Sequence, residues 1–173
     1  LKHLFLNIEK LNEILSDFTI TVSKDMKNVL DEIKPNTKII HNGSACGINL
    51  KNLQSIKNKE IKKRKIKVGY IGRLKKRKGS LILVEIVNHF KNRNDIEFIF
   101  CGFNDDEFYK ISKNQYQNVK ILGFVDNVKS FYNEIDILIL PSFHEGLSYA
   151  VIEALANGIL IIANNILGVN SVI

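Results

Sequence analysis

The chain contains little cysteine and little proline, no tryptophan and no long apolar run. Its 173 residues include two cysteines and two prolines. Cys46 and Cys101 are too few for the disulfide scaffold of a small secreted domain, so we expect unpaired thiols and a reducing, cytoplasmic location. The longest apolar stretches, Ile135–Pro141 and Ile159–Ala163, are far shorter than the roughly 18 residues that a membrane-spanning helix needs.

What is present is the composition of a globular protein with an excess of positive charge. Hydrophobic residues make up 45% of the chain and charged residues 25%, which excludes disorder and collagen-like or mucin-like character. The formal net charge is +7. Such a balance favours phosphate-rich partners: nucleotides, nucleic acid or an anionic membrane surface. The charge alone does not choose among them.

Short apolar segments alternate with amphipathic ones along the chain. This alternation predicts an α/β fold, with a Rossmann-like parallel sheet flanked by helices. Ligands of such sheets bind beyond the carboxyl ends of the strands, which singles out the loops at 72–79, 102–106, 123–127 and 142–146. We expect strands at 19–22, 38–40, 67–71, 96–101, 119–122, 135–140 and 159–163, and helices at 1–18, 24–33 (capped by Ser23), 80–91, 105–113, 128–133 and 146–157.

The first candidate site is the basic loop Gly72–Gly79, between a predicted strand and a predicted helix. Glycine lets a ligand approach the backbone closely, and the following helix offers unpaired N–H groups to an anion. Arg73 can bind a phosphate with a fork of donors and Lys78 adds a point charge, so together they could reach one diphosphate. The spacing matches neither a Walker A loop nor a GxGxxG fingerprint. The alternative is a basic loop that is merely solvated.

The second candidate is the segment Pro141–Ala154, which carries two glutamates. Glu145 is expected in a loop at the carboxyl end of a strand, and Glu153 in the following helix, roughly 12 Å further on. A carboxylate accepts paired hydrogen bonds from vicinal hydroxyls, which a hexose and a ribose both have. The amides of residues 146–148 would open the helix towards a diphosphate. The alternative is a helix N-terminal acid and an unrelated surface glutamate.

The order of these motifs resembles that of a known family. Gly-Arg-Leu-x-x-x-Lys-Gly at 72–79 is followed by Gly-Phe-Val-Asp at 123–126 and by a run that opens Pro-Ser-x-x-Glu-Gly-Leu at 141–147 and ends Glu-Ala-x-Ala-x-Gly at 153–158. From Lys67 to Ala163 the chain resembles the donor-binding domain of family-4 retaining glycosyltransferases of the GT-B fold. The earlier Ile-Ile-His-Asn-Gly is similar to the end of the N-terminal domain in that family.

The resemblance implies a role for each candidate residue. Arg73 and Lys78 would hold the donor diphosphate, while Glu145 would bind sugar hydroxyls and Glu153 the ribose hydroxyls. Enzymes of this kind need no metal and no cofactor, so the acidic run at 105–107 is interpreted as a helix start. The implied catalytic residues are Arg73, Lys78 and Glu145, and the implied donor-binding residues are Gly72, Gly102, Val125, Gly146, Leu147, Ser148 and Glu153.

The resemblance also divides the chain. We expect residues 1–48 to be the end of an N-terminal, acceptor-binding domain, 49–66 a linker, and 67–173 a donor-binding domain truncated at its C-terminus. The GT-B architecture would then be incomplete, and this chain alone is expected to bind a donor weakly and to transfer nothing. After the last strand the family has Gly-Gly-x-x-Glu, whereas Leu167–Ser171 lacks the first glycine and the glutamate.

The implied function is transfer of a sugar from a nucleoside diphosphate sugar, with a UDP-sugar favoured, to a glycan or lipid-linked acceptor in surface polysaccharide synthesis. A lipid-linked acceptor would place the protein at the inner face of the membrane, which the lysine run at 62–65 could contact. Three alternatives stay open: a related epimerase or phosphorylase, a degenerate nucleotide-sugar-binding domain, and a nucleic-acid binder. The last is disfavoured, because no aromatic side chains are interleaved with the lysine runs.

Overall fold

The computed structural model describes residues 2–31, 37–39, 48, 65–102 and 116–173. These residues fall into two compact units. The sheet unit comprises Ile48–His144 and Tyr149–Asn164, and the smaller unit comprises Leu1–Gly47, Glu145–Ser148 and Asn165–Ile173. The predicted helix at 105–113, most of the predicted linker and Cys46 lie outside the described residues.

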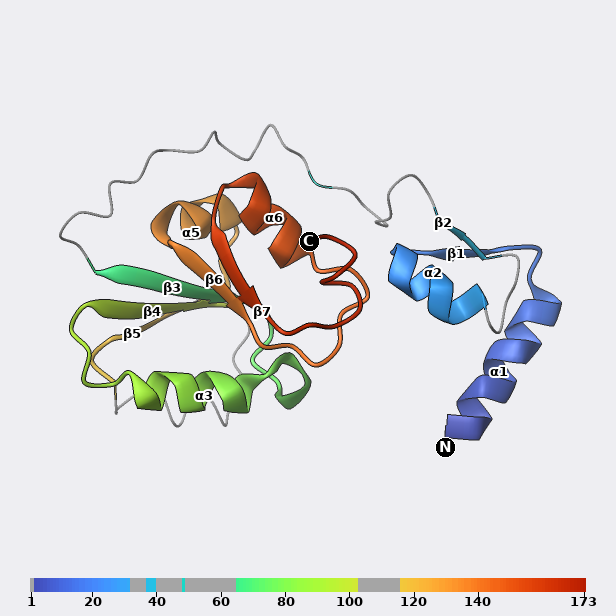
Figure 1. Cartoon of the computed structure of the whole chain (residues 1–173), viewed down its shortest axis with the longest axis horizontal. Coiled ribbons are helices and arrows are strands. Elements are labelled where there is room, and N and C mark those ends of the chain that lie inside the picture. The colour runs from blue at the N-terminus through green and yellow to red at the C-terminus, as the bar shows by residue number, and fades with distance from the viewer. Residues whose placement is uncertain (1, 32–36, 40–47, 49–64, 103–115) are drawn as a thin grey trace. The chain divides into compact units, whose positions relative to one another are not determined.

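The sheet unit is built on five parallel strands in the order β5-β4-β3-β6-β7. Helix α3 covers one face of this sheet, and helices α5 and α6 cover the other (Figure 1). The predicted α/β fold, a parallel sheet flanked by helices, is therefore confirmed. The strands are β3 (Ile66–Ile71), β4 (Ile96–Cys101), β5 (Val119–Gly123), β6 (Ile137–Leu140) and β7 (Leu160–Ala163), and the helices are η2 (Lys76–Lys78), α3 (Ser80–His89), α5 (Val128–Glu134) and α6 (Tyr149–Ala156).

The chain adds its later strands on both sides of β3. It first proceeds outward through β4 to β5, and then returns to the other side of β3 to form β6 and β7. The connections therefore diverge between β3 and β6, which is the topological switch point where parallel α/β sheets bind ligands. The loops that follow Ile71 and Leu140 flank this point.

Large apolar side chains fill both faces of the central strands. Phe98, Ile99 and Phe100 of β4 are at most 2% exposed, as the continuous apolar run predicts. On the face covered by α3, Leu83 and Val87 lie four residues apart along one side of that helix and are buried. On the other face a cluster joins Ile99, Cys101, Phe131, Tyr132, Ile135, Leu138, Ala154 and Ile159. Cys101 is a free thiol within it.

The smaller unit begins with helix α1 (Lys2–Leu15), followed by β1 (Thr19–Thr21), α2 (Lys24–Asp31) and β2 (Thr37–Ile39). Strands β1 and β2 pair in parallel. The predicted cap of α2 is confirmed, since Ser23 Oγ accepts a hydrogen bond from the backbone N–H of Met26 at 3.2 Å. Within the described residues, no helix combines the length and the hydropathy that crossing a bilayer requires.

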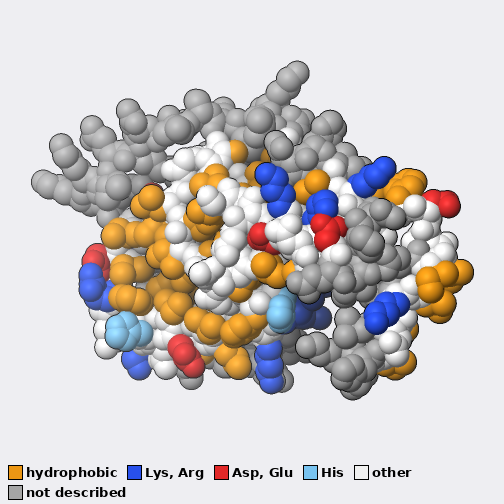
Figure 2. Space-filling view, turned by 45° about the vertical axis from the view of Figure 1, so that its right-hand side comes forward, with side chains coloured by type: hydrophobic (Ala, Val, Ile, Leu, Met, Phe, Trp, Pro, Cys, Tyr) orange, Lys and Arg blue, Asp and Glu red, His pale blue; other side chains and the backbone are white. Residues whose placement is uncertain are grey.

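Several element boundaries differ from the predictions. Strand β6 begins at Ile137 rather than at residue 135. Asp136, just before it, is bound to Lys67 twice: its N–H donates to the Lys67 carbonyl at 2.9 Å, and its Oδ2 accepts the Lys67 N–H at 2.9 Å. Helix α6 begins at Tyr149 rather than at residue 146. Leu160 and Ile162 of the edge strand β7 are 68% and 56% exposed, although the run around them is apolar. They belong to the exposed apolar surface of the sheet unit, and Figure 2 shows hydrophobic side chains gathered on one side of it.

Gly69 offers a test of the packing between β3 and α5. A β-carbon built there would lie 2.6 Å from Ile135 Cγ2 and 2.8 Å from Phe131 Cζ, and both of those side chains are buried. We expect Gly69→Ala to lower the free energy of unfolding by about 1–3 kcal/mol, measured by urea denaturation. Gly146→Ala is the matched control, since its added carbon would meet nothing closer than Val22 Cγ2 at 3.4 Å. Equal stability of the two variants would contradict this packing.

Candidate functional site

Glycines lie at the carboxyl ends of β3, β4 and β5, where backbone hydrogen bonds join the three strands. The Gly72 N–H donates to the Cys101 carbonyl at 2.9 Å, and the Gly102 N–H donates to the Gly123 carbonyl at 2.7 Å. A β-carbon on Gly102 would lie 2.1 Å from the Gly72 carbonyl oxygen, and Gly102 also has a φ of +129°. Only glycine fits such an approach. Gly72 and Gly102 therefore place backbone with no side chain of its own at the carboxyl ends of the strands, where a ligand of this fold binds.

Buried side chains hold the basic loop after β3 from the side of the core. The Tyr70 hydroxyl donates to the Arg73 carbonyl at 3.0 Å, and Tyr70 itself is fully buried. Leu74 is 2% exposed and anchors the turn in the core. The Arg73 side chain is exposed, whereas Lys78 is half-buried in the short helix η2. The loop is thus an ordered turn that carries its cations on a fixed backbone.

The loops after β3 and β6 pack against each other across the switch point. The Phe143 N–H donates to the Arg77 carbonyl at 3.0 Å. Gly79, with a φ of +80°, could not carry a β-carbon, because that atom would lie 2.2 Å from the Pro141 carbonyl oxygen. Between these loops the Ser142 hydroxyl is buried and has no hydrogen-bond partner among the described residues. The predicted loops after β3 and β6 are therefore joined by these contacts within the sheet unit.

The opposite edge of the sheet carries lysines of a different kind. Lys67 and Lys120 approach the same oxygen of Glu134, with Nζ–Oε1 distances of 3.2 and 3.1 Å. Burial opposes ionisation of Glu134, but the hydrogen bonds from Lys120 and Lys67 outweigh it and hold the pKa of that carboxyl below its usual value. These two lysines are part of an ion-pair network, whereas the basic loop lies at the carboxyl edge.

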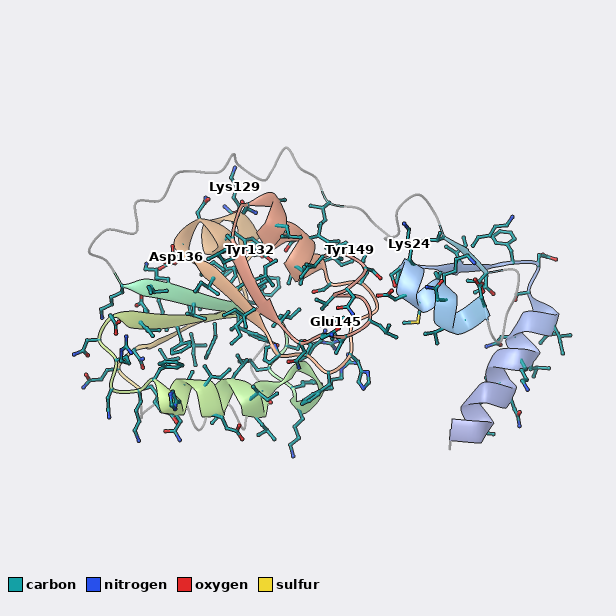
Figure 3. All side chains as sticks on the ribbon, viewed as in Figure 1. Lys24, Lys129, Tyr132, Asp136, Glu145 and Tyr149 are labelled. Atoms are coloured by element: carbon teal, nitrogen blue, oxygen red, sulfur yellow. The ribbon has the colours of Figure 1, made fainter. Side chains whose placement is uncertain are left out.

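Glu153 of α6 is held by a buried tyrosine of α5. The Tyr132 hydroxyl donates to Glu153 Oε2 at 2.7 Å and lies 3.4 Å from the Ala150 carbonyl oxygen. Tyr132, which is labelled in Figure 3, is 1% exposed. Burial raises its pKa far above the usual value, and the nearby Glu153 carboxylate raises it further. The phenol therefore remains a protonated hydrogen-bond donor at neutral pH.

Val125 and Cys101 connect the loop after β5 to the core. Burial raises the pKa of the Cys101 thiol, and a backbone hydrogen bond from Val125 offsets part of that rise. Val125 packs against the buried cluster on the α5 and α6 face. Its main chain is therefore fixed just beyond the end of β5, as a residue bordering a ligand requires.

In the smaller unit, residues 145–148 pack on a tight turn at Gly168. A β-carbon on Gly168 would lie 2.4 Å from the Glu145 carbonyl oxygen and 2.7 Å from that of Gly146. The Ser148 N–H donates to the Gly168 carbonyl at 3.2 Å, and the Gly168 N–H lies 3.4 Å from Asp25 Oδ2. Residues 146–148 precede α6, so they are not its first turn as predicted, and the Ser148 amide already has a partner.

The ten predicted site residues thus divide between the two units. Sequence reasoning missed Tyr132, although a tyrosine beside the apolar Phe131 in a predicted helix can signal a buried hydroxyl that needs a partner. It also missed Asp25, whose role depends on a contact 143 residues away. The sheet unit holds Gly72, Arg73, Lys78, Gly102, Val125 and Glu153, and the smaller unit holds Glu145, Gly146, Leu147 and Ser148.

Residues 65–173, which include the whole five-stranded sheet, match the family model described as "Glycosyl transferases group 1". This chain belongs to that family. The glycine edge, the basic loop and the two glutamates all lie inside the matched residues.

Individual relatives agree with this family. An uncharacterized 41.2 kDa protein in the cps region of Klebsiella pneumoniae is 31% identical over 129 residues, which are 72% of this chain and 34% of that protein. The capsular polysaccharide biosynthesis glycosyltransferase CapM of Staphylococcus aureus is 27% identical over 180 residues, covering 93% of this chain and 47% of CapM. The chain thus spans less than half the length of these relatives.

The fold is likewise that of solved glycosyltransferases. The crystal structure of Anabaena HepE in complex with UDP and glucose superposes with a TM-score of 0.74 at 18% identity, over 91% of this chain and 47% of HepE. The α/β fold described above is therefore shared with the matching part of HepE.

Gly168 offers a test of the turn that supports residues 145–148. Gly168→Ala combines a left-handed φ of +78° with two backbone collisions, so it should displace the turn and speed hydrogen exchange at the Ser148 amide. Gly123→Ala is the matched control, because its φ is +69° but an added carbon meets nothing within 4 Å. We expect Gly123→Ala to lower the free energy of unfolding only by the cost of backbone strain, about 1–2 kcal/mol. Unchanged protection of the Ser148 amide in Gly168→Ala would contradict the packing.

Proposed function

We propose that this chain carries the donor-binding part of a retaining, metal-independent glycosyltransferase of family 4. It would bind a nucleoside diphosphate sugar, and the whole enzyme would transfer the sugar to a glycan or lipid-linked acceptor in surface polysaccharide synthesis. The observation that carries the proposal is the glycine edge at Gly72 and Gly102, placed beside the Arg73–Lys78 loop at the switch point. That arrangement suits a diphosphate, because bare peptide groups allow close approach and the adjacent cations neutralise charge.

The proposed chemistry is electrostatic. When the bond between the sugar and the diphosphate breaks, negative charge builds on the departing diphosphate. Arg73 and Lys78 stand on a loop that Tyr70, Leu74 and the contact with Pro141 hold in place, so their charges need little rearrangement as the reaction proceeds. Preorganised cations of this kind lower the barrier to leaving-group departure. Glu145 would bind hydroxyls of the transferred sugar and Glu153 those of the ribose.

The comparisons support a UDP-sugar and a polysaccharide pathway. HepE was crystallised with UDP and glucose, and CapM is named for capsular polysaccharide biosynthesis. Because this chain shares the fold of HepE and 27% of the residues aligned with CapM, we propose the same donor class and pathway type for it. A lipid-linked acceptor would then place the protein at the cytoplasmic face of the membrane. Of the lysine run at 62–65, proposed to contact that surface, residues 62–64 lie outside the described residues.

A second candidate is a nucleotide-sugar-binding domain without catalysis. It is favoured by the turn after β7, where the family's glutamate is replaced by Ser171, whose hydroxyl lies 3.4 Å from the Asp25 amide nitrogen. Both candidates require donor binding, and they differ only in turnover by the whole enzyme.

Removing the Arg73 guanidinium tests the proposed site. We expect Arg73→Ala to weaken UDP binding about ten- to a hundredfold in calorimetric titration, since hydrogen bonds to charged groups contribute about 1.5–3 kcal/mol. Arg93→Ala is the matched control: it removes the same charge, but Arg93 is paired with Asp95, near the amino end of β4. UDP affinity should be unchanged in that variant. Equal losses in both variants, or RNA binding tighter than UDP binding, would contradict the proposal.

A further inference from the structure

The pair formed by Tyr132 and Glu153 is the best-defined polar contact of a predicted site residue. Its donor and acceptor come from different helices, α5 and α6, and are 21 residues apart. We propose that Tyr132 is a positioning residue, whose hydroxyl orients the Glu153 carboxylate. In that orientation the carboxylate can accept hydrogen bonds from both vicinal hydroxyls of the donor nucleotide's ribose. The inference rests on the proposed function and goes beyond it, because it assigns specificity for the ribose diol to a side chain that would not touch the ligand.

The first step is that the tyrosine ring cannot move. Tyr132 packs in the buried cluster with Ile135, Leu138 and Ala154, and its ring lies edge-on to Phe131 with centroids 5.3 Å apart. A close-packed core fixes the position of such a ring. The hydroxyl is therefore a fixed point at the boundary between the core and the half-buried Glu153.

The second step is that one fixed hydrogen bond orients a carboxylate. A glutamate has three rotatable side-chain bonds, and on a helix surface its carboxylate samples several orientations. The 2.7 Å hydrogen bond from Tyr132 to Oε2 selects one of these orientations. The other carboxylate oxygen, Oε1, takes no part in this hydrogen bond. An ionised carboxylate offers about four acceptor positions, so the bond to Tyr132 leaves enough of them for two ribose hydroxyls.

The third step is that Tyr132 stays a donor. Burial and the carboxylate itself raise its pKa, so the phenol keeps its proton over the working range of the protein. A phenolate at this place would repel Glu153 instead of holding it. The carbonyl of Ala150, at 3.4 Å, is the weaker of the two acceptors near the hydroxyl.

A purely structural role makes different predictions. If the hydroxyl served only to satisfy a buried polar group, its removal would change stability and leave discrimination of the ribose untouched. The two roles are therefore separated by comparing UDP with 2′,3′-dideoxy-UDP, which has the same diphosphate and base but no ribose hydroxyls at those positions.

The experiment titrates both ligands into the 173-residue chain and its Tyr132→Phe variant, which keeps the ring and loses one oxygen. We expect Tyr132→Phe to weaken UDP binding about three- to tenfold, the effect of one hydrogen bond, and to leave 2′,3′-dideoxy-UDP binding unchanged. Glu153→Ala should weaken UDP binding at least as much. Adding Tyr132→Phe to Glu153→Ala should then have no further effect, because the two residues act through one contact.

A second variant keeps the test decisive if Tyr132→Phe folds poorly. Glu153→Asp retains the charge but withdraws the carboxylate by one methylene from the reach of Tyr132, at a half-buried position. It should lose UDP affinity by a factor similar to that of Tyr132→Phe and retain 2′,3′-dideoxy-UDP affinity.

The contradicting outcomes are distinct. Unchanged UDP affinity in Tyr132→Phe, equal losses for the two ligands, or losses that multiply in the double variant would each overturn the positioning role alone. Failure of the unsubstituted chain to bind UDP would instead overturn the proposed function, and this inference with it.

Discussion

The approach of three strand ends to one another is the constraint on which the rest of the sheet unit depends. At the end of β4, Gly102 lies so close to the Gly72 carbonyl that a single β-carbon would overlap it at 2.1 Å. The backbone hydrogen bonds from Gly72 to Cys101 and from Gly102 to Gly123 then connect β3, β4 and β5 at the same edge. Because Gly72 and Gly102 have no side chains of their own, this edge can bring peptide groups close to a ligand.

The cationic loop after β3 and the core contacts that hold it both lie next to that edge. The loop after β3 can carry its cations outward only because Tyr70 and Leu74 hold its backbone from the buried side. Across the switch point, the Pro141 carbonyl occupies the space beside Gly79, which ties the β6 loop to the same turn. At the other edge Lys67 and Lys120 are engaged with Glu134. Basic residues of the sheet unit therefore occur in two settings, in ion pairs at one edge and in an exposed loop at the other.

Much of the sheet unit could be predicted from the sequence. The run 96–101 is strand β4 with the predicted boundaries, because a continuous apolar segment between turn residues leaves few alternatives. The start of α6 could not be predicted, since Gly146–Ser148 are held outside the helix by a turn at Gly168, far along the chain. The contact of Tyr132 with Glu153 was equally inaccessible: it depends on how two helices pack, which local periodicity does not contain. Local patterns thus predict elements, whereas contacts between elements decide which groups of a site are already engaged.

Mapping UDP onto the backbone amides of this chain by NMR is the most direct test of the central claim, which is that the carboxyl edge binds a nucleoside diphosphate. The account predicts that the largest chemical-shift changes fall at Gly72, Arg73 and Gly102, where peptide groups are exposed beside the cationic loop. Changes centred instead on Lys67, Glu97 and Lys120, at the opposite edge, would contradict it. Such a result would mean that UDP meets the ion-pair network and that the glycine edge serves only the packing of the strands.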